Sequence, residues 1–213
     1  MDIIAHCRPL KRNEHLHRAG TALNSLYAIQ SGFLRTSVSI NDGREQVVGF
    51  PMTGELTGMD AIGTGMHQCD TVALEDSSLC GIRYADLEEL GHAIPALQNH
   101  LHRAMGAEIA REHGIMLLLG AMRAEERIAA FLLNLSIRFS ARGYSGTSFR
   151  LPMTRQDIGS YLGLKFETVS RVFFRFNDLR LISVNSRTIT IENLAKLQQR
   201  AGSLEAGYSR ARG

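Results

Sequence analysis

The segment from Arg155 to Phe174 constrains the fold of this chain more than any other, because it carries the residue spacing of a helix-turn-helix. Gly159 is small where two short helices would cross, and Gly163 stands where the turn between them favours a positive φ. Thr154 is placed to cap the first helix. The apolar positions that such a pair must bury are Ile158, Leu162, Leu164, Val169 and Val172.

The second helix of this pair has a polar face that lies away from its valines. A recognition helix offers such a face to the major groove of DNA. An amphipathic helical hairpin within an ordinary core is the alternative, but few such hairpins combine a turn glycine with an Arg/Glu pair on the free face. The polar residues are Lys165, Glu167, Ser170 and Arg171.

The N-terminal and C-terminal parts of the chain differ in net charge. Residues 144–213 contain 11 Lys and Arg against 5 Asp and Glu, whereas residues 1–143 contain 13 against 16. A basic C-terminal segment is what attraction to DNA phosphates requires, although a solvated basic face without a partner would look the same. Charge alone does not decide between the two.

Composition places the chain among globular cytoplasmic proteins. It has 213 residues, of which 44% are hydrophobic, so it can form one large or two modest cores. No apolar run approaches the roughly 20 residues of a membrane span, and the N-terminus lacks the pattern of a secretory signal. Cys7, Cys69 and Cys80 match no zinc motif, and we expect reduced thiols rather than disulfides.

The N-terminal part reads as short strands separated by turns. Regular hairpins of this kind indicate an all-β roll or barrel. The sharpest turn signal is Asp42-Gly43, which predicts an exposed loop between two strands. The predicted strands cover residues 26–29, 33–40, 46–50, 69–74 and 79–83.

A short helix over residues 84–91 and a long one from Pro95 to about Leu119 follow the strands. The long helix carries an apolar stripe, and a parallel pairing with a second copy would suit a DNA reader, because dimers span half-sites about 34 Å apart. Glu112 interrupts the stripe. Two such carboxylates about 5 Å apart would repel by about 3 kcal/mol at an effective dielectric constant of about 20, unless Glu112 faces water or pairs with an arginine such as Arg111 of the other copy. The predicted dimerisation residues are Leu101, Met105, Ile109, Glu112, Met116 and Leu119.

The rest of the chain completes a winged helix-turn-helix. Residues 124–142 form an amphipathic helix, 149–151 a short strand, and residues 181–184 and 188–191 a β-hairpin after the recognition helix.

With these parts in this order, the chain resembles the Crp/Fnr family of bacterial transcription regulators, and its Fnr branch in particular. The resemblance rests on residues 25–32, 54–63, 124–136 and 154–164, and above all on Glu167-Thr-Val-Ser-Arg171. It implies an α+β fold with a cyclic-nucleotide-binding-like β-roll over residues 1–91 and a dimerisation helix over 92–122. A winged helix-turn-helix over 123–200 and a frayed tail over 201–213 complete the predicted domains.

The resemblance also implies which residues contact DNA. In Fnr-like proteins Glu, Ser and Arg at this spacing read a TTGAT-type half-site, which assigns base contacts to Glu167, Ser170 and Arg171. Lys165 and Phe166 depart from the family's usual Thr-Val, so the flanking preference is not carried over. The other residues expected to face DNA are Thr154, Arg155, Lys165 and Thr168.

Most of the residues that bind effectors in this family have no counterpart in this chain. Cyclic-nucleotide binders hold the phosphate with an Arg-Ser or Arg-Thr pair, but here the segment reads His67-Gln-Cys-Asp-Thr71, and Asp70 would repel an anion. Oxygen-sensing relatives hold a [4Fe-4S] cluster with four cysteines, of which only Cys80 has a counterpart. Either the sequence is a shortened form of a cluster-binding sensor or it belongs to a relative without the cluster, in which Cys80 is a structural thiol.

The resemblance further implies contacts with RNA polymerase. The loop at Asp42 and Gly43 is similar to the loop that touches the sigma subunit, and the region near Arg142 to the surface that faces the α subunit. Asp-Gly is also a good turn in its own right, and Arg142 can complement the dipole of a helix end.

Two other functions remain possible from the residues. One is a sensor of haem or another small ligand on the same scaffold. The other is a cupin-like metal enzyme, because His15-Leu-His17 has the spacing of a metal-binding strand. The following residues, Arg18 to Thr21, supply no carboxylate ligand, which argues against the enzyme.

Overall fold

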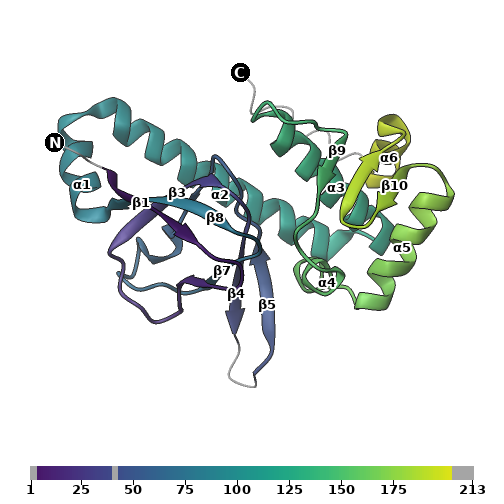
Figure 1. Ribbon diagram of the computed structural model, residues 1–213, viewed down its shortest axis with the longest axis horizontal. Helices are drawn as coiled ribbons and strands as arrows, with labels where there is room; N and C mark the ends of the chain where they lie inside the picture. The colour runs from purple at the N-terminus through teal and green to yellow at the C-terminus, as the bar shows by residue number, and fades with distance from the viewer. Residues whose placement is uncertain (1–3, 40–42, 203–213) are drawn as a thin grey trace. The chain divides into compact units, whose positions relative to one another are not determined.

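The computed structural model describes residues 4–39 and 43–202, and it separates into two compact units, Met1–His113 and Gly114–Gly213. The boundary falls inside the long helix α2 (Pro95–Ala121) (Figure 1). Within the described residues, no helix combines the length and apolar character needed to cross a bilayer.

The first unit is a β-roll built from antiparallel strands. One sheet has the order β1-β8-β3-β6 and the other β2-β7-β4-β5. The helix α1 (Tyr84–Ala93) follows the last strand directly. The strands are β1 (Ile4–Leu10), β2 (His15–His17), β3 (Ser25–Ser31), β4 (Leu34–Ser39), β5 (Glu45–Gly49), β6 (Leu56–Thr57), β7 (Asp70–Ala73) and β8 (Ser77–Arg83), with a short 3-10 helix η1 (Met59–Ala61) before β7.

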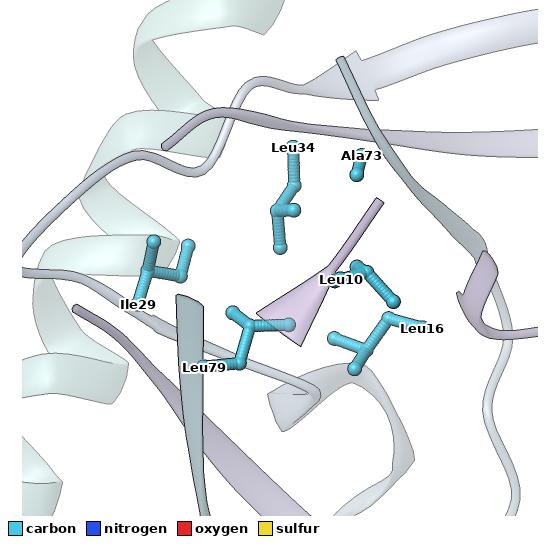
Figure 2. Close-up of a cluster of buried hydrophobic side chains, with 6 residues drawn as sticks. All are labelled: Leu10, Leu16, Ile29, Leu34, Ala73 and Leu79. Carbon is cyan, nitrogen blue, oxygen red and sulfur yellow. The ribbon is translucent and has the colours of Figure 1, made fainter. Parts of the chain in front are cut away.

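The core of the roll lies between the two sheets, where alternate residues of each strand point inward. Figure 2 shows side chains from both sheets meeting there, and most of them are fully buried. The partly buried Tyr27 packs against this cluster. The cluster consists of Leu10, Leu16, Ile29, Leu34, Ala73 and Leu79.

One contact in the roll contradicts a sequence prediction. Cys7 of β1 and Cys80 of β8 are paired across the two strands and form a disulfide, so the prediction of reduced thiols is wrong for both. The sequence could not reveal this, because the two cysteines are 73 residues apart and only the antiparallel register brings them together. Cys69 is free and buried, as expected for a reduced thiol.

The disulfide predicts a simple thiol count. Denatured protein prepared without reductant should show one reactive thiol, that of Cys69, and reduced protein should show three. Cys80→Ser should raise the count without reductant to two, because Cys7 loses its partner. A count of three in untreated wild-type protein would contradict the disulfide.

The second unit contains the predicted winged helix-turn-helix. Its three-stranded sheet has the order β10-β11-β9, and the hairpin β10–β11 is the predicted wing. A last helix, which the sequence analysis did not predict, is amphipathic and buries Leu197 and Ala201. The elements are α3 (Ala124–Ser140), β9 (Ser148–Arg150), α4 (Arg155–Leu162), α5 (Phe166–Asp178), β10 (Ile182–Asn185), β11 (Thr188–Ile191) and α6 (Leu194–Ala201).

Candidate nucleic-acid interface

Helix α4 begins where the sequence predicts, because Thr154 caps it. The Thr154 hydroxyl accepts a hydrogen bond from the backbone N–H of Asp157 at 3.1 Å, and the Asp157 carboxylate accepts one from the Thr154 N–H at 2.8 Å. This reciprocal arrangement satisfies two N–H groups at the helix start. It also orients the hydroxyl of Thr154 toward its own helix.

The turn between α4 and α5 depends on its two glycines. Gly163 has φ +62° and ends α4 in the left-handed conformation, as predicted. At Gly159, a Cβ atom would lie 2.6 Å from the carbonyl oxygen of Leu164, whose N–H donates to the Gly159 carbonyl at 2.8 Å. The backbone after the turn thus passes so close to α4 that only glycine fits at the crossing.

One side of α5 is anchored in the core of the second unit. Its inward side chains are at most 7% exposed, and the cross-element contacts of α5 include α3, α4 and β10. Burial of this face fixes the rotation of the helix about its axis, and hence the direction in which the other face points. The anchoring residues are Val169, Val172, Phe173 and Phe176.

The opposite side of α5 carries the residues predicted to read DNA. Glu167 and Arg171 are exposed and Ser170 is partly exposed, so none of the three is turned into the core. Lys165, which precedes the helix, is exposed, and Thr168 is partly exposed. Their placement permits contact with a major groove, while the contacts themselves stay a prediction.

Arg155 lies in a different setting from the other DNA candidates. Its guanidinium sits 3.5 Å from the centroid of the Phe173 ring, and burial lowers the pKa of Arg155 to about 10. A stacked, partly desolvated guanidinium holds a fixed orientation on the first turn of α4. DNA contact by Arg155 stays a prediction, and packing on Phe173 is the role that the structure shows.

Two sets of side-chain contacts, made by Arg127 and Glu125, support the interface and were not predicted from the sequence. The side chain of Arg127 donates to the carbonyls of Leu119, Met122 and Leu162, each at 2.9 Å, and so ties the ends of α2 and α4 to α3. Glu125 accepts from Arg175 at 2.5 Å and from Arg200 at 3.0 Å. Leu162 lies 35 residues from Arg127, and the two arginines lie 50 and 75 residues from Glu125, so no local pattern indicates these partners.

Glu125→Gln should therefore weaken the link between α3, α5 and α6. Glu125 is 24% exposed and both arginines are more so, which limits the expected loss of stability to about 0.2–1 kcal/mol. Urea unfolding at low salt measures it. At high salt the difference from wild type should shrink, and a loss that is independent of salt would contradict an ionic origin.

The predicted dimerisation face of α2 is partly exposed in the single chain. Ile109 is 51% and Met116 61% exposed, and Leu119 is 37% exposed. Leu101 and Met105 are partly buried, and Glu112 is exposed. An apolar stripe left open in this way is compatible with a second copy packing on it.

Arg111 has partners within its own chain. It bonds to Glu55 at 3.4 Å and to Glu108 one turn earlier on α2. The suggested pairing of Glu112 with Arg111 of a second copy would compete with these contacts.

The residues predicted to contact RNA polymerase are only partly described. Asp42 lies outside the described residues, and Gly43 adopts φ +83°, which suits the predicted turn. Arg142 follows α3, and its guanidinium donates to the carbonyl of Arg138 at 2.7 Å. The structure therefore shows Arg142 stabilising the end of its helix, as the alternative interpretation expects.

The segment that would hold a cyclic phosphate is already engaged internally. The Asp60 carboxylate accepts hydrogen bonds from the backbone N–H groups of Gln68 and Cys69, at 2.8 and 3.1 Å. Burial and then the nearby carboxylates, with Asp60 first, raise the pKa of Cys69 to about 11. An internal carboxylate thus occupies backbone donors of the segment that the family resemblance places at the phosphate site.

Comparison with known families assigns a known domain type to each end of the chain. Residues 7–93 match the model of the cyclic nucleotide-binding domain, and residues 126–200 match the Crp-like helix-turn-helix domain. The two matches together include the β-roll and the winged helix-turn-helix.

Individual relatives agree with these matches over nearly the whole chain. The chain is 45% identical over 201 residues to the fumarate nitrate reduction regulatory protein of Klebsiella oxytoca, covering 94% of this chain and 80% of that protein. It is 46% identical over 190 residues to the transcriptional activator protein FnrA of Stutzerimonas stutzeri, covering 89% and 78%. The solved structure of FixK2 from Bradyrhizobium japonicum superposes with a TM-score of 0.84 at 27% identity, covering 92% of this chain and 96% of that one.

Proposed function

Because this chain belongs to the Crp/Fnr family of DNA-binding transcription regulators and not to an enzyme family, we propose that it binds a two-fold symmetric TTGAT-type site as a homodimer. The observation that carries the proposal is the orientation of α5, whose buried face leaves Glu167, Ser170 and Arg171 accessible on the other side. These are the residues to which the family resemblance assigns base contacts.

The chemistry of the three side chains suits the bases of such a half-site. The Arg171 guanidinium can donate two parallel hydrogen bonds to O6 and N7 of guanine. The Glu167 carboxylate can accept from N4 of cytosine, and the Ser170 hydroxyl can bond to a base or a phosphate. Lys165 and the wing would then contribute phosphate contacts, which position the protein without reading sequence.

Methylation interference tests whether the reading takes place in the major groove. Methylation of guanine N7 within the half-sites should prevent binding, because it removes the acceptor that Arg171 needs. Methylation of adenine N3 in the minor groove of the same half-sites should have little effect. Binding that tolerates N7 methylation would contradict the proposed contact.

We infer that dimerisation uses the open apolar stripe of α2, with Glu112 as a repulsive pair at its centre. Glu112→Ala should then tighten the dimer, because two carboxylates no longer face each other. Sedimentation equilibrium measures the dimer constant, with Glu108→Ala as a control that removes a carboxylate already paired with Arg111. Equal dimer constants for Glu112→Ala and wild type would remove the repulsion hypothesis.

The proposal includes a contact with RNA polymerase through the loop at Asp42 and Gly43, and a cytoplasmic location where the chromosome is accessible. It also includes Arg142 as a contact, with one guanidinium nitrogen bonded to the carbonyl of Arg138 at the end of α3. It includes no cyclic nucleotide, and the internal bonds of Asp60 support this. A [4Fe-4S] cluster would need the Cys7–Cys80 disulfide to be reduced before Cys80 could serve as a ligand.

A further inference from the structure

Three side chains with metal-binding atoms meet in the β-roll, apart from the helix-turn-helix. His17 comes from β2, Asp60 from η1, and His67 from the segment before β7. One potential ligand atom of each lies within 4.8 Å of the other two. The sequence next to His15 and His17 contains no carboxylate ligand, because the fold supplies Asp60 from η1.

We propose that His17, Asp60 and His67 bind a divalent transition-metal ion of the Zn²⁺ type. Two imidazole nitrogens and one carboxylate oxygen form a ligand set that such ions prefer, whereas Mg²⁺ and Ca²⁺ prefer oxygen ligands alone. Three protein ligands leave a further coordination position for water. The site lies in the β-roll and does not include any residue proposed to contact DNA.

The hydrogen bonding of the cluster leaves one nitrogen unsatisfied. Among the described residues, no hydrogen-bond partner reaches the buried Nδ1 atom of His17. Buried polar atoms nearly always have a partner, so this nitrogen is open to a water or an ion. The Nδ1 of His15 is also buried without a partner, but His15 is not one of the three clustered residues.

The other two ligands are held in place by the fold. His67 is 3% exposed, and its Nδ1 lies 3.2 Å from Oδ1 of Asp60. The second oxygen of Asp60 accepts from the N–H groups of Gln68 and Cys69, which fixes the carboxylate. This contact is a hydrogen bond that an ion would replace. Ligand atoms on one tetrahedral Zn²⁺ are about 3.3 Å apart, given bonds of about 2.0–2.1 Å, so the replacement needs little change in the separation of the two atoms.

The His17 imidazole must reorient to complete the site. Their rings are stacked with centroids 3.6 Å apart and an angle of 8° between the planes. A metal lies in the plane of each imidazole that binds it, and nearly parallel planes cannot share an ion between them. Binding therefore requires His17, the more exposed of the pair, to tilt out of the stack.

Titration of the full chain with ZnCl₂, followed by calorimetry, tests the proposal. Wild-type protein should bind a single Zn²⁺ per chain with saturable heat. His17→Gln and Asp60→Asn should each weaken binding by roughly 10–100-fold, as loss of a ligand or its support does at other sites. His15→Gln is the matched control, because His15 lies on the same strand and is not among the three clustered residues. It should bind Zn²⁺ as wild type does.

A second measurement separates loss of the site from loss of the fold. Zn²⁺ should raise the melting temperature of wild type and His15→Gln, because a ligand that binds only the folded state stabilises it. At the same Zn²⁺ concentration it should raise that of His17→Gln by less, even where the variant without metal melts as wild type does. Absence of saturable binding by wild type, or equal weakening by His15→Gln and His17→Gln, would overturn the proposal.

Discussion

Arg171→Ala is expected to cost about 1–3 kcal/mol of binding free energy on a duplex with intact TTGAT-type half-sites, and to remove discrimination at the contacted guanine. The guanidinium is exposed on α5, and its two parallel donors match the acceptors O6 and N7 of guanine. Alanine removes both donors and leaves the buried face of the helix unchanged. Fluorescence anisotropy with intact duplexes, and with duplexes in which that base pair is replaced, measures the loss and its base dependence.

Lys165→Ala provides the matched control for this variant. Lys165 is exposed at the start of the same helix and is expected to contact phosphate. Its loss should weaken binding to all duplexes alike and reduce the magnitude of the salt dependence by about one counterion. If Arg171→Ala behaves as Lys165→Ala does, Arg171 contacts the backbone and the assignment of base reading to it is wrong.

Gly159→Ala is expected to destabilise the second unit by about 1–3 kcal/mol, the usual cost of forcing an extra methyl group into a packed position. The new Cβ would lie 2.6 Å from the Leu164 carbonyl oxygen, and that backbone cannot withdraw without moving the start of α5. The displaced helix should also bind DNA more weakly. Urea unfolding followed by far-UV circular dichroism measures the first effect, and anisotropy the second.

Gly120→Ala is the control for the helix-crossing variant. Gly120 lies in α2, where a Cβ would meet nothing within 4 Å. Because alanine favours helix over glycine, this variant should be unchanged or more stable by up to about 1 kcal/mol. If Gly159→Ala is as stable as wild type, α4 and α5 are not packed as closely as the structure shows.

The helix-turn-helix was predictable because its evidence is local. The cap at Thr154, the turn at Gly163 and the buried valines follow from spacing within about twenty residues, and local propensity agrees there with the global fold. The five predicted strands of the roll, which correspond to β3, β4, β5, β7 and β8, and the wing were indicated for the same reason, whereas β1, β2 and β6 were not among the predicted strands. Alternation and turn residues indicate hairpins without knowledge of distant contacts.

Most of the contacts that the sequence did not reveal join segments that are distant in sequence. Cys7 meets Cys80 only through strand register, and Asp60 meets His17 and His67 only because η1 lies beside the end of β2. Arg155 has the charge of a DNA contact, but its position over Phe173 depends on how α4 packs on α5. A pattern within one segment cannot specify such partners.

The most direct test of the central claim compares the affinity of wild-type protein for two duplexes of equal length and composition at one salt concentration. One carries two inverted TTGAT-type half-sites centred about one helical turn, or a whole number of turns, apart, and the other carries the same bases scrambled. The account predicts binding to the intact site about 10³-fold tighter or more, with the protein bound as a dimer. Equal affinity for the two duplexes would contradict it, because the exposed face of α5 would then not be reading sequence.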